Sequence, residues 1–535
     1  MKKVFKIITL IVTGLITIAC SAGNAKPWTQ GKSVQGNPIE VEISAKEMKE
    51  IEEKMEKGKA LAEEAKDFAA FLDIYNELRK DKSLCFQADE TNELKYHVFA
   101  KEEDKEQYLS YIELQNKINQ WFNEVEHMCA ENDFKPLLYG DMSDEDIQAY
   151  IGVKLPQEYY DADNKISQLI ADYYALDDDD NYYNNVDILY KQLQECQKVV
   201  ATYLGYDNYL DYCYSNVYGR DYSVSDTDSF FANLYKYAVP TYQKYSNLIS
   251  SLGPSLTQDE LKLADTIFYG DAFTQCFDLI EDYKDFYGGF LKEQFDGLFC
   301  KNGHYNISYE KNGLAGAYQN CFTYNGNPYN YVFFGPGYHY SIAIVHEFGH
   351  YLSSCANPYS GVSFDFAETQ SQSDEFLFLQ YLRQSDKYDF SNAFKDFLVD
   401  YYVKEDIVNM FICAVVNEAE KIVYAQDSYE IGDLEKAVTS IYNKYPILDE
   451  MYNLDYMIMY CTDVTMYSSG YYISYSTSIL GALAVNSLAA KNYDQAKELY
   501  AKIIDPKQHV GYVDGYKYVG IGDPFSEDTF KTIFA

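Results

Sequence analysis

The most informative stretch of the sequence is SIAIVHEFGHYL, at residues 341–352. Its two histidines, His346 and His350, are four residues apart, so on a helix both imidazoles lie on one face and reach one Zn²⁺. Glu347 then lies beside the metal, where a carboxylate accepts a proton from a metal-bound water. The surrounding residues are apolar, which predicts that the helix is buried: Ile342, Ile344, Val345, Phe348 and Leu352.

A zinc site of this kind needs a third protein ligand and one open position. A metzincin has Gly and His at the positions that Ser353 and Ala356 occupy here, so that class is excluded. The following segment, residues 364–380, is predicted to be helical and carries Glu368 and Glu375 seven residues apart on one face. We therefore expect the third ligand to be a carboxylate from this second helix.

The rest of the chain is predicted to be mainly helical. Proline is rare, 12 in 535 residues, and apolar residues recur at helical spacing over residues 43–131 and 185–222. Residues 316–340 differ, because Asn325-Gly326 is typical of a tight turn and the strand-like run YVFF follows it at 331–334. The sequence thus predicts a small β element directly before the histidine helix.

The charge of the chain excludes two classes of partner. Lys and Arg number 44 and Asp and Glu number 83, which gives a net charge of −39. A nucleic-acid-binding protein carries a basic surface, and so does a protein that holds anionic lipid by charge. Tyrosine is unusually frequent, with 57 residues. Either it replaces phenylalanine through compositional bias, or some of the phenols line a binding channel.

The N-terminus has the organisation of an export signal. Lysines at positions 2, 3 and 6 precede an apolar run over residues 7–19, which is too short to span a bilayer as a mature helix. Thr17-Ile18-Ala19-Cys20 resembles a bacterial lipobox. We therefore expect a signal peptide over residues 1–19, a lipidated Cys20 and a flexible tether over residues 20–40. The alternative is an ordinary secretory signal cut nearby. No later segment is expected to cross a membrane.

Several motifs resemble one known family. FAETQSQ at residues 366–372, with Glu375 after it, is similar to the segment that carries the glutamate ligand in the oligoendopeptidase F and thimet oligopeptidase family of zinc peptidases. Further segments match the oligoendopeptidase F branch and extend the similarity over roughly residues 190–535: LGYDNYLDY at 204–212, GRDY at 219–222, GAY at 316–318, PY at 328–329 and GIGD at 520–523.

This resemblance implies a mainly α fold, with a two-lobed helical shell around a deep substrate channel and a small β element next to the HExxH helix. An N-terminal helical lobe is expected over residues 41–190 and a catalytic zinc metallopeptidase region over residues 191–535. We also expect the strand near residues 331–334 to present an edge to an extended peptide.

The resemblance assigns the metal ligands as well. It implies that His346, His350 and Glu368 hold one Zn²⁺ per chain and that Glu375 orients a zinc-bound histidine. Glu347 is then the general base, which accepts the proton of the water and passes it to the leaving amine.

Tyrosines are implied as oxyanion donors. Tyr475 matches the family's donor best, and Tyr467 or Tyr471 is expected to assist it. Thr465 departs from the pattern, because the family usually has a histidine there. That departure removes a substrate-binding and electrostatic group.

The implied function is zinc-dependent hydrolysis of short oligopeptides by a lipoprotein on the outer face of a bacterial cell membrane, attached only through its lipid anchor. Nucleic acid is not an expected partner. Two alternatives stay open. One is a lipoprotein that binds peptides for a transporter, although pure binding has no use for the HExxH motif and its glutamate. The other is a catalytically degenerate peptidase fold, which Thr465 alone favours.

Overall fold

The structure is a computed structural model that describes residues 27–174, 176, 182–270, 272–301, 303–358 and 361–534. Cys20 and the predicted signal peptide lie outside the described residues. Helices make up most of the described chain and a small four-stranded sheet accompanies them, which confirms the predicted mainly α class.

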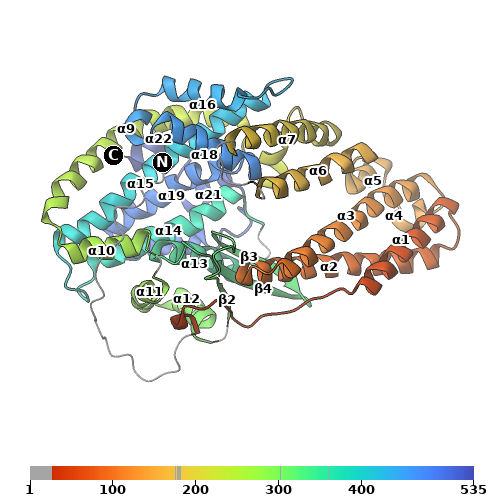
Figure 1. The fold of residues 1–535 in the computed structure, drawn as a ribbon, viewed down its shortest axis with the longest axis horizontal. Helices are drawn as coiled ribbons and strands as arrows, with labels where there is room; N and C mark the ends of the chain where they lie inside the picture. The colour runs from red at the N-terminus through yellow and green to blue at the C-terminus, as the bar shows by residue number, and fades with distance from the viewer. Residues whose placement is uncertain are drawn as a thin grey trace.

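The first helices form an arm that projects from the body of the protein (Figure 1). This arm comprises α1 to α5, and α6 and α7 follow it: α1 (Ala45–Glu64), α2 (Phe68–Phe99), α3 (Glu102–Glu131), α4 (Lys135–Tyr139), α5 (Asp144–Ile151), α6 (Gln157–Tyr174) and α7 (Tyr182–Leu204). The arm has its own hydrophobic core, which includes Phe71, Leu78 and Trp121. Buried residues of α6 and α7 belong instead to the core of the body. The N-terminal lobe, expected to end at residue 190, therefore has a separate core only as far as Ile151.

The body is built from the remaining helices: α8 (Tyr209–Tyr212), η2 (Cys213–Val217), η3 (Val224–Asp226), α9 (Thr227–Leu252), η4 (Gly253–Ser255), α10 (Gln258–Phe268), α11 (Phe273–Tyr287), α12 (Gly289–Phe295), η5 (Asp296–Cys300), α13 (Ser341–Ala356), α14 (Phe364–Gln384), α15 (Asn392–Tyr424), α16 (Asp433–Lys444), α17 (Leu448–Met451), α18 (Leu454–Tyr467), α19 (Ile473–Lys491), α20 (Tyr493–Ile503), α21 (Tyr512–Val519) and α22 (Glu527–Ile533). Among the described residues, α19 alone is long and apolar enough to cross a membrane, judged by length and composition. It packs against α14 and α15, and 72% of its most apolar window is buried inside the protein.

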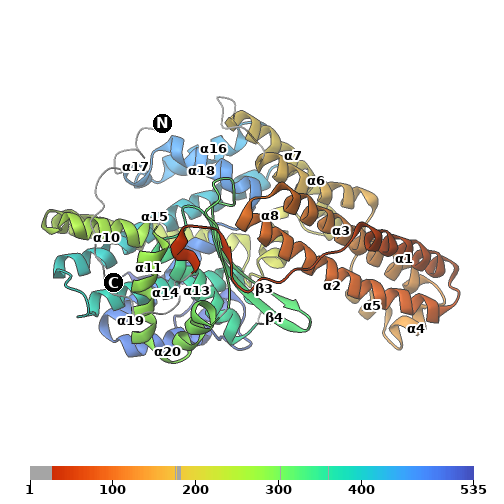
Figure 2. The same ribbon diagram turned by 60° about the horizontal axis from the view of Figure 1, so that its bottom comes forward.

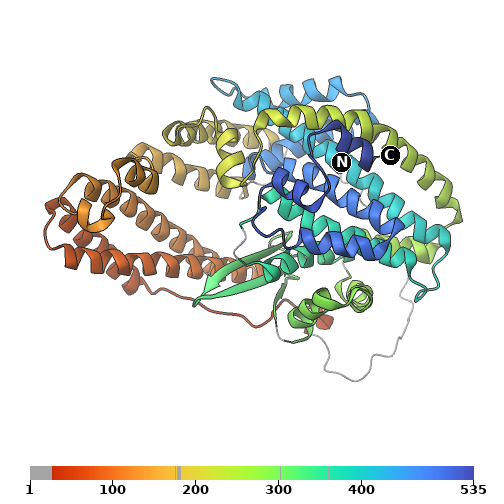
Figure 3. The ribbon, with the colours of Figure 1, turned by 180° about the vertical axis from the view of Figure 1, so that it is seen from behind.

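The sheet lies where the arm meets the body (Figure 3). Its strands are β1 (Val34–Gln35), β2 (His304–Ile307), β3 (Ala317–Tyr324) and β4 (Asn327–Phe334), in the order β1-β2-β4-β3. β2 and β4 are parallel, and the other two pairs are antiparallel. Asn325 and Gly326 join β3 to β4 with φ angles of +49° and +79°, which confirms the predicted turn.

The strand expected to offer an edge is in fact central. The residues of β4 from Tyr331 to Phe334 pair with β2 on one side and with β3 on the other. Their backbone groups are therefore already used, and the expectation was wrong. The outer strand on this side of the sheet is β3, the first half of the hairpin, so the available edge belongs to β3.

The second half of the predicted tether is also ordered against the body. Trp28 is 1% exposed, and its ring lies 4.9 Å from that of Phe277 and 5.1 Å from that of Tyr305. Val34 then pairs with Ile307 in the sheet. Figure 2 shows this segment in dark red beside α11, leading on toward α1. The indole supplies a large apolar surface that the polar composition around it concealed.

Two helices of the body approach unusually closely. A Cβ added to Gly349 in α13 would lie 2.8 Å from the Cα of Ser371 in α14 and 3.2 Å from the carbonyl oxygen of Gln370. Only a residue without a side chain permits this separation. Because His346, His350 and Glu368 lie on the facing turns of these two helices, the glycine sets the distance between them.

Gly349→Ala is expected to destabilise the protein. Alanine gains about 1 kcal/mol of helix propensity, but overpacking against a backbone costs about 1–3 kcal/mol, so the free energy of unfolding should fall. A matched control is Gly297→Ala, because a Cβ at Gly297 meets nothing within 4 Å. The urea concentration at the unfolding midpoint should fall for Gly349→Ala, and it should stay level or rise for Gly297→Ala. A Gly349→Ala protein as stable as the wild type would refute the packing argument.

Candidate metal centre and active site

α13 presents its two histidines toward α14. The helix begins at Ser341, directly after the β4 strand and the turn at Gly337, whose φ is +84°. Its apolar residues are buried on the other faces, as the sequence predicted. His346 and His350 lie on the remaining face of α13, where they are partly accessible. The imidazole rings are 4.9 Å apart, so they face a common point.

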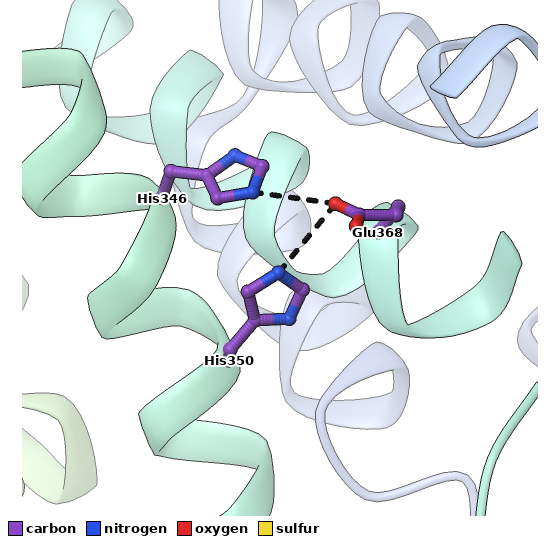
Figure 4. Close-up of side chains that lie close together, drawn as sticks. All are labelled: His346, His350 and Glu368. Carbon is purple, nitrogen blue, oxygen red and sulfur yellow. Dashed lines mark ion pairs between the residues drawn. The ribbon is translucent and has the colours of Figure 1, made fainter. Parts of the chain in front are cut away.

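Glu368 completes the group from the neighbouring helix. Figure 4 shows both imidazoles directed at one carboxylate oxygen, Glu368 Oε2. This oxygen lies 3.2 Å from His346 Nε2 and 3.5 Å from His350 Nε2. Tetrahedral zinc with bonds of about 2.1 Å places neighbouring ligand atoms about 3.4 Å apart. The three donor atoms all lie within 4.8 Å of one another and are thus placed to hold a single Zn²⁺.

The charges of the site favour a cation. Burial would raise the pKa of Glu368, but His350 and His346 outweigh burial and hold that pKa well below its ordinary value. Burial would likewise lower the pKa of His346, whereas hydrogen bonds to Glu368 and Glu375 raise it well above its ordinary value. The same carboxylates that hold a proton on His346 would stabilise a metal ion at its Nε2.

Glu375, which the family resemblance implies as the group that orients a zinc-bound histidine, contacts His346. The Nδ1 atom of His346 lies 2.6 Å from Glu375 Oε1, and because a carboxylate only accepts, the imidazole donates here. The remaining nitrogen, Nε2, then offers its lone pair to a metal. On the other side, the hydroxyl of Tyr402 donates to Glu375 Oε2 at 2.5 Å. The orienting carboxylate is therefore itself held in place.

Glu347 is buried next to the ligand group. Its carboxylate is 6% exposed, and Oε2 makes no hydrogen bond within the described part of the chain. Burial raises the pKa of Glu347, although the neighbouring His346 and His350 lower it. A carboxylate with a raised pKa and an unused oxygen is suited to accept a proton and to release it again.

The tyrosines differ in their distance from this group. The hydroxyl of Tyr471 donates to Glu368 Oε1 at 2.5 Å, and it lies 3.3 Å from the hydroxyl of Tyr475. Burial raises the pKa of both phenols well above its ordinary value, so both remain donors. The Tyr467 hydroxyl instead pairs with that of Tyr472 at 2.7 Å. Tyr471, which we expected only to assist, makes the direct contact.

Thr465 does not face the ligands in the way that a substrate-binding group would. It is fully buried in α18, and its hydroxyl donates to the carbonyl of Cys461 in the same helix at 2.7 Å. The position therefore serves the packing of α18.

Sequence reasoning missed two residues of α15 beside the site. Tyr402 carried no signal among so many tyrosines. Asp406 is 6% exposed, and burial together with Glu375 raises its pKa well above its ordinary value. An aspartate directly before the apolar run IVNMFICAVV was a signal that could have indicated a buried acid.

Comparison with known proteins connects this site to a known fold. By sequence, the chain matches no protein-family model and no curated protein. By structure, it superimposes on PZ peptidase A with inhibitor 2 at a TM-score of 0.64 and 13% identity, over 91% of this chain and 95% of that one. It superimposes on oligoendopeptidase-F from Enterococcus faecium at a TM-score of 0.53 and 13% identity, over 91% and 95% of the two chains. The structural neighbours are thus members of the oligoendopeptidase F and PZ peptidase family, and this chain shares their fold.

Proposed function

We propose that this protein is a zinc-dependent endopeptidase that hydrolyses short oligopeptides. One observation carries the proposal: His346, His350 and Glu368 converge on one point, with the buried carboxylate of Glu347 beside them. A peptide-binding protein needs no such set, and every member of it is present, which argues against a degenerate peptidase fold. The shared fold with two peptidase structures agrees with this assignment.

Each residue then has a task. When bound, zinc polarises the scissile carbonyl and acidifies the attacking water. Glu347 accepts the proton of that water and passes it to the leaving amine. Tyr475 donates a hydrogen bond to the oxygen on which negative charge develops, and Tyr471 does so when its hydroxyl turns from Glu368 toward that oxygen. Glu375 and Tyr402 keep the imidazole of His346 in the orientation that ligation requires.

Substrate backbone is recognised at the free edge of β3. An extended peptide that adds to this edge forms hydrogen bonds through its main chain, so recognition depends little on side chains. In β3, Ala317 pairs with Phe334, directly before the turn into α13, so the edge leads toward the metal ligands.

Zinc ligation and proton transfer can be separated by mutation. Glu347→Gln should lower kcat by about 10²–10⁴-fold and leave one zinc per chain, because the base is lost but no ligand is. His350→Ala should lose both zinc and activity. Glu375→Gln should weaken zinc binding by about 10–100-fold, since it removes the acceptor of the Nδ1 proton. Metal analysis and cleavage of a quenched peptide measure these effects.

Chelation and restoration with Zn²⁺ provide the control for all three variants. A wild-type protein that binds peptides without zinc and never cleaves them would support the transport-lipoprotein alternative. A Glu347→Gln variant with near wild-type kcat would show that another group is the base.

Substrate length is the next expectation. An extended peptide of about a dozen residues spans about 40 Å and can reach the β3 edge and the metal together, whereas a folded protein cannot unwind into that site. The same sequence should therefore be cleaved as a free peptide and resist cleavage inside a folded host protein. Unfolding the host with mild denaturant should restore cleavage. Equal cleavage rates for the free peptide and for the same sequence in the folded host protein would exclude a site that admits only extended peptides.

We also propose an exported location, with the chain attached to the membrane through a lipid on Cys20. Cys20→Ser should release the protein from the membrane fraction, because α19, the apolar helix of the body, is packed inside it. Fractionation followed by immunoblotting measures this. Retention of the variant in the membrane would refute the lipid anchor, and removal of residues 1–19 in a soluble wild-type protein would indicate the ordinary secretory signal instead.

A further inference from the structure

A short loop carries the tyrosine that touches the metal-ligand group. α18 ends at Tyr467 and α19 begins at Ile473, so residues 468–472 must place Tyr471 accurately. Gly470 within this loop has a φ of +73°, a conformation that other residues rarely adopt. The loop has a turn hydrogen bond of its own, from the Tyr471 N–H to the Ser468 carbonyl at 3.0 Å, and further contacts from outside hold its geometry.

Arg220 supplies those contacts. Its side chain is fully buried, and its guanidinium donates through Nη1 to the Gly470 carbonyl at 2.8 Å and through Nη2 to the Tyr471 carbonyl at 3.4 Å. A further donation from Nη2 reaches Ser474 Oγ at 2.7 Å, at the start of α19. The guanidinium also lies over two aromatic rings, that of Tyr214, whose centroid is 4.2 Å away, and that of Tyr218.

The remaining donor of Arg220 reaches the ligand helix. Its Nε donates to Asp365 Oδ2 at 2.7 Å, and Asp365 lies in α14, three residues before Glu368. Tyr222 and Thr477 each donate to the other oxygen of Asp365 at 2.6 Å. The planar guanidinium of Arg220 thus joins α14, which carries Glu368, to the loop that carries Tyr471. The fixed directions of its N–H donors constrain the position of both.

A second buried side chain binds the same loop. Glu420 in α15 is 1% exposed, and its Oε1 accepts the backbone N–H of Gly470 at 2.7 Å. The hydroxyl of Tyr218 donates to the Ser469 carbonyl at 2.8 Å. Both polar groups of the Gly470 backbone are therefore bound by buried side chains that come from distant parts of the sequence.

We propose that Arg220 is a positioning residue, which sets the phenol of Tyr471 against the metal-ligand group and so controls the chemical step. The proposal rests on the proposed peptidase function, in which Tyr471 donates to the developing oxyanion. A misplacement of about 1 Å in such a donor costs about 10²-fold in rate. The competing interpretation is a buried ion pair that stabilises the fold without any particular effect on catalysis.

A double-mutant cycle on the zinc-loaded enzyme distinguishes these interpretations. Tyr471→Phe removes the phenol alone and should lower kcat by about 10²–10³-fold. Arg220→Lys keeps the charge beside Asp365 but loses the fork of donors, and should lower kcat by about 10²-fold with KM changed by less than about threefold. A misplaced phenol contributes no more to kcat than an absent one. The variant that combines Arg220→Lys with Tyr471→Phe should therefore be no slower than Tyr471→Phe alone.

The matched control is Arg383→Lys, in a half-exposed arginine that pairs with Asp396, and its kcat should equal the wild-type value. Zinc content should remain at one per chain in every variant. If Arg220→Lys does not fold, Ser474→Ala replaces it in the cycle, because it removes one acceptor of Arg220 without burying an unpaired charge. Its smaller loss in kcat should likewise disappear in the Tyr471→Phe background.

Three results would overturn the proposal. The first is an Arg220→Lys variant with wild-type kcat. The second is a double variant whose loss is the product of the two single losses, as independent effects require. The third is a Tyr471→Phe variant with wild-type kcat, and in that case loss of cleavage in Glu347→Gln would still leave the peptidase assignment standing. A wild-type protein that cleaves no peptide removes both proposals together.

Discussion

Buried carboxylates need hydrogen-bond donors, and the carboxylates of α14 obtain them from helices and loops that pack around it. α14 carries four such acids within eleven residues, and all are at most 4% exposed. Each of them accepts a tyrosine hydroxyl at 2.5–2.6 Å, in the pairs Tyr222–Asp365, Tyr471–Glu368, Tyr283–Asp374 and Tyr402–Glu375. A buried acid without a donor would cost several kcal/mol. The four tyrosines come from four different segments of the chain. The hydrogen-bond needs of the carboxylates in α14 therefore also determine which segments pack around this helix.

This arrangement gives the high tyrosine content a physical meaning beyond compositional bias or a channel lining. Burial raises the pKa of all four phenols well above its ordinary value, so each stays protonated and donates. A phenol satisfies a carboxylate without bringing a second charge into the core, whereas lysine or arginine would have to be desolvated as well. The chain has arginine at only three positions, 79, 220 and 383. The one that is buried with an acid, Arg220, contacts backbone groups that a phenol could not bind together.

The sequence predicted what depends on local spacing. The HExxH helix, the β-turn at Asn325-Gly326 and the helix that carries Glu368 and Glu375 all follow from periodicity within a few turns of chain. It could not predict the edge strand, because β3 and β4 have similar composition and only the position of β2 decides which is central. Nor could it predict that Tyr471 rather than Tyr475 contacts Glu368, since that contact depends on a loop held by Arg220 from 250 residues away. The burial of Trp28 against α11 could not be predicted either, because it also depends on residues far away in the sequence.

Charge balance in the site favours a bound cation. Glu347, Glu368, Glu375 and Asp406 lie together in the interior, and the two imidazoles are the nearest groups able to become cationic. In the absence of a metal, the carboxylates raise the pKa of His346, so a proton occupies the place of a cation. Zinc must displace that proton, because a protonated imidazole nitrogen has no lone pair to donate. The carboxylates therefore act in two opposing ways. They strengthen the attraction for Zn²⁺, and they also make its proton competitor harder to remove, so the affinity for metal should decline as the solution becomes more acidic. Under the proposed function, the buried acids beyond the ligands would thus determine how tightly zinc is held as well as how the imidazole of His346 is oriented.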